Sequence, residues 1–179
     1  MTGVVGLDSI IRGGFPRGRL FLIEGDPGVG KTTLALQFLM EGVRLGERVV
    51  YVTLSETKEE VHAVAASHEW SLAGIDIYEL ASPDALMGDE QNTLFHPSEV
   101  ELAETTKAVL DLCTRIKPQR VVLDSLSEIR LLAQSPLRYR REVLALKQYF
   151  AGRGCTVLLL DDRSSTTGDS HLQSIAHGV

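Results

Sequence analysis

The amino-acid sequence predicts an α/β fold with a mostly parallel β-sheet and helices on both of its faces. Short runs rich in valine, isoleucine and leucine are continuously apolar, as strands buried on both faces are. Segments of helical periodicity separate these runs, and this alternation favours right-handed crossovers between parallel strands. With 179 residues, 44% of them hydrophobic, residues 1–179 are expected to form a single domain with its own core.

The apolar runs predict five strands in chain order. They are Leu20–Glu24, Arg48–Leu54, Ile75–Leu80, Arg120–Asp124 and Thr156–Leu160. In sheets of this class, ligands bind at the carboxyl ends of the strands. The residues that directly follow each run are therefore the first candidates for a functional site.

Apolar side chains at helical spacing predict the helices between the strands. The expected helices are one from about Lys31 through Val43, one at Thr57–Ser67, one from about Ser98 to Ile116, and one with its apolar stripe from Tyr139 to Phe150. The last of these is expected to be the first helix after the strand that ends at Asp124. The irregular stretch Ala81–Pro97 is interpreted as a surface excursion within the domain, because the apolar pattern resumes directly after it.

Composition limits the classes of partner. The net charge of −6 offers no basic face to nucleic acid or to an anionic membrane. Cys113 and Cys155 lie in separate apolar stretches, which favours two reduced core thiols over a disulfide framework or a metal site. No run is long enough to cross a bilayer and no signal-peptide pattern precedes residue 20, so the protein is expected in the cytoplasm without membrane contact.

The segment GDPGVGKT, Gly25–Thr32, has the form GxxxxGKT and lies between an expected strand and an expected helix. This P-loop, or Walker A, context lets backbone N–H groups and the helix N-terminus surround a polyphosphate. Lys31 is expected to reach the β- and γ-phosphates of ATP. Thr32 is expected to place its hydroxyl on Mg²⁺, with Thr33 one residue further along the same turn.

Two carboxylates complete the predicted site. Asp124 ends an apolar strand as a Walker B aspartate does, and is the second expected magnesium ligand. Its alternative is a helix cap or turn residue. Glu56 follows the strand Arg48–Leu54 and is the candidate general base for hydrolysis. The alternative for Glu56 is a carboxylate at the start of the Thr57–Ser67 helix, favourable there on dipole grounds alone.

Several segments together resemble the KaiC family of RecA-like ATPases over essentially the whole chain. Besides the P-loop and the strand ending in Asp124, they are TGVVGLDSIIRGGFPRG (Thr2–Gly18), VTLSET (Val52–Thr57) and HEWSL (His68–Leu72). The resemblance implies a RecA-type core, ATP bound between subunits, and hexameric rings. In the clock protein of this family, slow hydrolysis and autophosphorylation serve timekeeping. The nucleotide contacts that it implies are Gly28, Val29, Gly30, Lys31, Thr32 and Thr33, with Ser67 near the base.

Two features depart from that family pattern. The clock protein carries two adjacent glutamates where this chain has Ser55 and then Glu56, so hydrolysis is expected to be slower or to rest on Glu56 alone. Family domains also continue through further strands, whose lysine and arginine side chains reach a neighbour's γ-phosphate. Because this sequence stops at Val179, in the approach to another strand, we expect it to be an N-terminal piece of a longer protein.

Other constellations carry less weight. The five histidines lack partners at metal-ligand spacing, and Trp70 is expected to anchor the core. Arg138, Arg140 and Arg141 are interpreted as a solvated face or a subunit contact. The segment Asp161–His171 is expected to be a loop, and its three aspartates against one arginine argue against DNA binding.

Three functions remain open at this point. The first is an ATPase that acts in signalling or timing as a homo-oligomeric ring read by protein partners. The second is a nucleotide-switched assembly scaffold with little turnover, which the missing glutamate favours. The third is a RecA/RadA-like, DNA-dependent ATPase, which the acidic balance of the chain disfavours.

Overall fold

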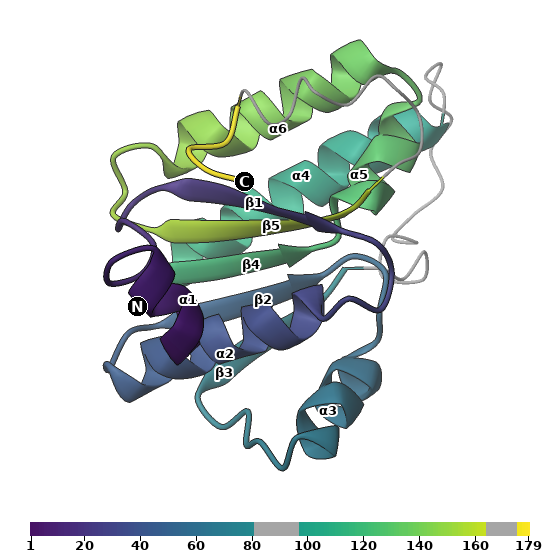
Figure 1. Cartoon of the computed structure of the whole chain (residues 1–179). Coiled ribbons are helices and arrows are strands. Elements are labelled where there is room, and N and C mark those ends of the chain that lie inside the picture. Colours follow the sequence, from purple (N-terminus) through teal and green to yellow (C-terminus); the bar gives the residue numbers. More distant parts are fainter. Residues whose placement is uncertain (81–96, 164–174) are drawn as a thin grey trace.

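The sheet is built from five parallel strands in the order β1-β5-β4-β2-β3 (Figure 1). The computed structural model describes residues 1–80, 97–163 and 175–179. The strands are β1 (Leu20–Gly25), β2 (Val49–Thr53), β3 (Ile75–Glu79), β4 (Arg120–Asp124) and β5 (Thr156–Asp162). All five predicted strands are present, and the predicted α/β fold class is confirmed.

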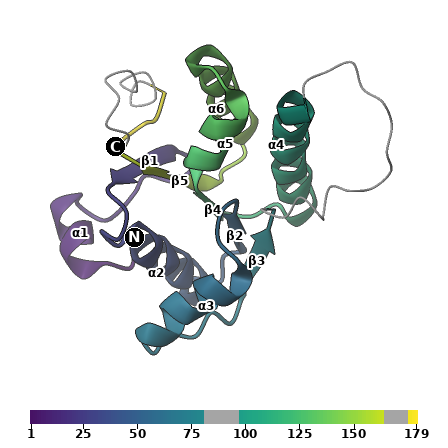
Figure 2. The ribbon, with the colours of Figure 1, turned by 90° about the vertical axis from the view of Figure 1, so that its right-hand side faces the viewer.

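Helices cover both faces of the sheet, as Figures 1 and 2 show. The two helices α2 and α3 lie on one face, and α4, α5 and α6 lie on the other. The helices are α1 (Val5–Ile10), α2 (Lys31–Arg44), α3 (Lys58–Ser67), α4 (Pro97–Ile116), α5 (Leu126–Ala133) and α6 (Pro136–Phe150). Among the helices in the described ranges, none is both long and apolar enough to cross a bilayer.

Two apolar layers explain why the central strands are continuously hydrophobic. Within β4, Val121 and Leu123 pack against α4, α5 and α6, whereas Val122 packs against α2 and α3. Neighbouring side chains of a strand point to opposite faces, so a strand covered on both sides needs apolar residues at every position. The predicted core anchor Trp70 is half-buried against the α2 and α3 layer and stacks on His68.

Two predictions about elements are wrong, and one short helix was not predicted. The first helix after β4 is α5, not the helix that contains Tyr139, because Leu126, Ile129 and Ala133 already form a short buried stripe directly behind the strand. The short helix α1 was not predicted, because its buried residue is the polar Asp8 and it therefore lacks an apolar stripe. Asp161 and Asp162 belong to β5 and not to a loop, because both continue the pairing with β1.

Several predictions fall partly outside the described residues. The excursion Ala81–Pro97 lies there except for Pro97, which begins α4, and so do residues 164–171 of the predicted acidic loop. The last described residues return to the edge of β1. The His177 amide donates to the carbonyl of Leu20 at 2.8 Å, and the carbonyl of Gly178 accepts from the Leu22 amide at 3.0 Å.

Candidate functional site

The P-loop connects the end of β1 to the start of α2. Gly28 and Gly30 have φ angles of 81° and 94°, a region that favours glycine. A side chain at Gly25 would bring its Cβ within 2.6 Å of the Val29 side chain. Within the described chain, no side chain caps the start of α2. The loop therefore presents a glycine backbone and a helix N-terminus, a combination suited to anions.

Lys31 is held at the mouth of this loop. Its Nζ donates to the carbonyls of Gly25 at 3.0 Å and Asp26 at 2.9 Å, and lies 2.8 Å from Oδ1 of Asp162. Asp162 is the last residue of β5, and its side chain is 45% exposed. A polyphosphate in the loop would compete with this exposed carboxylate for the ammonium group of Lys31.

The side chain of Asp124, at the end of β4, contacts residues of both α2 and β2. The hydroxyl of Thr32 donates to Oδ2 of Asp124 at 3.1 Å, and the hydroxyl of Tyr51 donates to the same oxygen. Burial raises the pKa of Asp124 and outweighs the hydrogen bonds from Tyr51 and Thr32 and the charge of Lys31, which lower it. A nearby cation would relieve that cost. The buried carboxylate and the threonine hydroxyl are oxygen ligands of the kind that Mg²⁺ takes, so this pair fits the ion.

Glu56 lies just beyond the end of β2. Thr53, the last residue of that strand, pairs in register with Asp124. Its hydroxyl accepts from the Glu56 amide at 2.9 Å and donates to the Glu56 carbonyl at 2.7 Å. Among the described residues, the buried Oε2 atom of Glu56 has no hydrogen-bond partner. Burial raises the pKa of Glu56, and the negative charges of Asp124 and Glu60 add to this effect.

The start of α3 bears on the competing interpretation of Glu56. Thr57 is the N-cap residue, and it forms a reciprocal capping box with Glu60. The two acidic residues in the first turn of α3 are Glu59 and Glu60. Glu56 precedes the cap, so α3 is capped without it. A buried carboxylate oxygen left without a partner calls for an explanation beyond helix capping.

The other predicted nucleotide contacts lie in the P-loop, in the first turn of α2 and at the end of α3. Gly28, Val29 and Gly30 form the exposed turn of the P-loop, and Thr33 follows Thr32 in the first turn of α2. Ser67 is the last residue of α3, about 15 Å along the helix from its start. Its exposed hydroxyl donates to the carbonyl of Val64 at 2.7 Å. Its role near the base stays a prediction.

Sequence reasoning missed the residues that support the site from inside the sheet. Tyr51 was read only as part of an apolar strand, although a buried tyrosine hydroxyl normally needs a hydrogen-bond partner. Asp161 is fully buried and accepts from Ser127 at 3.1 Å and from Tyr139 at 3.2 Å, and it pairs with Arg130. The signal available in the sequence was that β5, like β4, ends in aspartate.

The histidines and the arginine cluster do not form a second functional site within the described residues. Within the described residues, no group of three or more histidine, cysteine, aspartate or glutamate side chains is arranged to hold a metal ion. His96 and His171 lie outside those residues, while His177 accepts from the Leu20 amide at 3.2 Å. On α6, Arg138 and Arg141 are exposed and Arg140 is half-buried. Whether this face meets another subunit stays a prediction.

Comparisons with known proteins agree with the observed fold. A family model described as "ATPase: KaiC" matches residues 1–179. A UPF0273 protein of Thermotoga maritima is 31% identical over 190 residues, which cover 99% of this chain and 75% of the relative. A UPF0273 protein of Pyrococcus horikoshii is 29% identical over 185 residues, with coverages of 99% and 74%. The crystal structure of the KaiC-like protein PH0186 from Pyrococcus horikoshii OT3 is similar with a TM-score of 0.75, 26% identity, and coverage of 98% of this chain and 76% of that one.

Proposed function

This chain belongs to the KaiC family of ATPases, and from that premise we propose that it binds ATP with Mg²⁺ and hydrolyses it slowly. The observation that carries the proposal is the 3.1 Å hydrogen bond between Thr32 and Asp124, which are 92 positions apart in the sequence. A P-loop threonine beside a carboxylate at the end of another strand, here β4, is the arrangement that a nucleotide and its metal ion need.

Each residue of the site receives a role in this proposal. The backbone from Gly28 to Thr33 binds the phosphates, and Lys31 exchanges Asp162 for the terminal phosphates when ATP enters. Thr32 and Asp124 would hold Mg²⁺, which would neutralise negative charge on the phosphate oxygens. Tyr51 orients the Asp124 carboxylate through its hydrogen bond. Val29 and Ser67 are proposed as further contacts, the latter near the base.

Glu56 is proposed as the general base. Its Oε2 atom would orient the attacking water and accept a proton from it, as the water oxygen bonds to the γ-phosphorus and the bond from this phosphorus to the bridging oxygen of ADP breaks. The raised pKa of Glu56 strengthens it as a proton acceptor but leaves less of it ionised. Ser55 stands where a second carboxylate is found in the clock protein of the family. Both features favour slow turnover.

At the level of the whole protein, we propose a homo-oligomeric ring in the cytoplasm to which protein partners bind. In this proposal residues 1–179 form the ATPase domain of a longer protein, and ATP lies at the boundary between subunits. Signalling or timing is the proposed use of such a slow cycle. Nucleic acid is not a proposed partner, because the net charge of −6 leaves few cations for phosphate contacts.

A nucleotide-switched scaffold with little turnover is the second candidate, and Ser55 is the observation that favours it. Phosphate release from the full-length protein with ATP and Mg²⁺, measured with and without single-stranded DNA, separates the candidates. Our proposal expects basal release that DNA does not change. Release that requires DNA supports a recombinase-like activity. Binding of ATP with no release under either condition supports the scaffold.

A further inference from the structure

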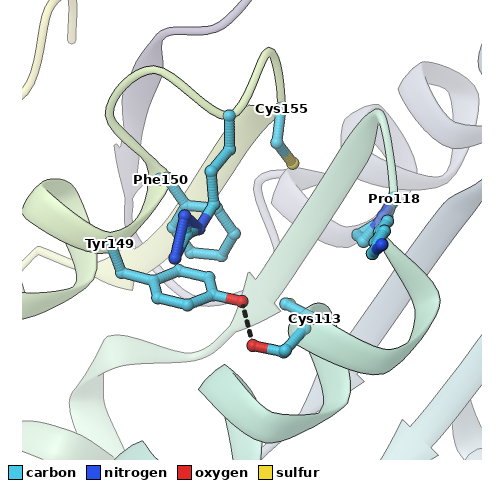
Figure 3. A pocket seen from close by; sticks show the side chains of 8 residues that line it. Cys113, Pro118, Tyr149, Phe150 and Cys155 are labelled. Atoms are coloured by element: carbon cyan, nitrogen blue, oxygen red, sulfur yellow. Dashed lines mark hydrogen bonds between the residues drawn. The ribbon is translucent and has the colours of Figure 1, made fainter.

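A cavity lies at the edge of the sheet opposite to the P-loop. It has a volume of about 370 Å³ and is formed where α4 and α6 end and β4 and β5 begin. Figure 3 shows Tyr149 and Phe150 on one side of it, with Cys113 and Pro118 across from them. Its size is within the range of small-molecule sites, about 300 to 1,000 Å³.

The inner wall of this cavity is apolar and uncharged. Cys113, Phe150 and Cys155 are buried core residues. Burial raises the pKa of the Cys113 thiol to about 12 and also raises that of Cys155, so both remain neutral thiols at physiological pH. The hydroxyl of Tyr149 donates to the carbonyl of Leu110 at 3.0 Å and lies 2.7 Å from the hydroxyl of Thr114, so it is satisfied within the protein and the aromatic ring supplies the apolar surface.

The mouth of the cavity is cationic. Lys117 and Arg153 line it and are both exposed, and no aspartate or glutamate of the described chain is among its lining residues. The guanidinium carbon of Arg153 lies 4.1 Å from the centroid of the Tyr149 ring, which holds this charge beside the aromatic wall. An apolar chamber with positive charge at its opening complements a ligand that has an apolar body and one anionic group.

We propose that this cavity binds a small aromatic anion. The rings of Tyr149 and Phe150, 5.0 Å apart at an angle of 88°, provide the apolar contact, and Lys117 and Arg153 bind a carboxylate or sulfonate at the mouth. Positive side chains near helix C-termini also stabilise helices without any ligand. That role requires no cavity beside them, whereas a binding site does. Because the P-loop lies at the other edge of the sheet, ATP and this ligand bind at the same time.

Two matched dyes test the proposal on the full chain. 1-Anilinonaphthalene-8-sulfonate (ANS) carries the anionic group, and N-phenyl-1-naphthylamine has the same rings without it. Fluorescence titration is expected to give one saturable site that prefers ANS. Arg153→Glu should weaken ANS binding roughly five- to tenfold and leave the neutral dye nearly unchanged. Arg115→Glu is the matched control, since Arg115 is exposed on α4 but does not line the cavity.

A second variant fills the cavity with a larger side chain and leaves the charges at its mouth unchanged. Thr114 is exposed and lines the cavity, so Thr114→Trp fills the cavity from its rim and should reduce the binding of both dyes. Circular dichroism checks that each variant unfolds at the wild-type temperature. ANS binding that ATP displaces, or that both Arg153→Glu and Thr114→Trp leave intact, would overturn the proposal. Neither result bears on whether the P-loop binds ATP.

Discussion

Glu56 carries a cost to the fold beside its proposed role as general base. Its buried Oε2 atom has no partner among the described residues, and its pKa is raised by burial and by the charges of Asp124 and Glu60. For a carboxyl group, a raised pKa means that ionisation is less favourable in the folded than in the unfolded chain. Such unfavourable arrangements persist where the function of a protein needs them.

Glu56→Gln should therefore stabilise the nucleotide-free protein at neutral pH. The wild-type contribution from Glu56 is favourable while the group is protonated and is lost as the pH rises through its raised folded pKa. The advantage of the glutamine variant should be largest above that pKa and disappear below about pH 4, where the unfolded chain is also protonated. Thermal unfolding across this pH range measures it. The control is Glu59→Gln, at an exposed position in the first turn of α3.

Asp162 and Lys31 allow a second test at the scale of single residues. Their ion pair occupies the ammonium group that the phosphates need, and Asp162 is partly exposed. Such pairs contribute about 0.2 to 1 kcal/mol, so Asp162→Asn should tighten ATP binding by roughly 1.5- to 5-fold. Isothermal titration calorimetry measures the change. Glu41→Gln, which removes an ion pair with Arg44 on α2, should leave the affinity as it is; weaker ATP binding in Asp162→Asn would show that Asp162 supports the nucleotide.

At the scale of elements, the end of β5 is joined to α5 and α6 by one buried carboxylate. Asp161 is fully buried and interacts with Ser127 and Arg130 of α5 and with Tyr139 of α6. Asp161→Ala leaves the Arg130 charge without this carboxylate, so the free energy of unfolding should fall by about 3 to 5 kcal/mol. Tyr139→Phe removes one hydrogen bond and should cost only about 1 kcal/mol. Urea unfolding measures both variants, and an equal loss of unfolding free energy in the two would contradict the role of Asp161 in joining β5 to α5 and α6.

Most strands and long helices could be predicted because burial on both faces of a sheet leaves a strong apolar pattern. The prediction failed where polar residues occupy buried positions or where an element is short. Asp161 lies in a strand because Ser127, Arg130 and Tyr139 satisfy its carboxylate, and no local pattern contains those partners. The helix α5 has only eight residues and begins two residues after β4 ends, so its short apolar stripe is hard to separate from the apolar run of the strand.

The candidate site was predictable where chemistry is encoded in a local motif. Lys31, Thr32 and Asp124 follow from the P-loop spacing and from the end of an apolar strand, and the structure brings Thr32 to Asp124. Tyr51 and Asp162 could not be predicted in the same way. The partner of Tyr51 lies on β4, and the partner of Asp162 lies on α2, which follows β1. Both contacts exist only because the sheet order places β2 beside β4 and β5 beside β1.

For the whole molecule, the family and the proposed position of ATP at a subunit boundary predict assembly linked to nucleotide. The full-length protein should increase in mass when ATP and Mg²⁺ are added, because ATP would add contacts across that boundary. Light scattering coupled to size exclusion measures the mass with and without ATP. The variant Lys31→Ala should not respond. A monomer under both conditions counts against the ring.

We propose that this domain binds ATP at the P-loop and hydrolyses it with Glu56 as the base. The direct measurement is ATP affinity and phosphate release, determined side by side for the wild type and Glu56→Gln in the full-length protein. The variant should bind ATP with the affinity of the wild type and lose turnover by a factor of about 10² to 10⁴, the usual effect of removing a general base. Turnover of Glu56→Gln at the wild-type rate would contradict this proposal.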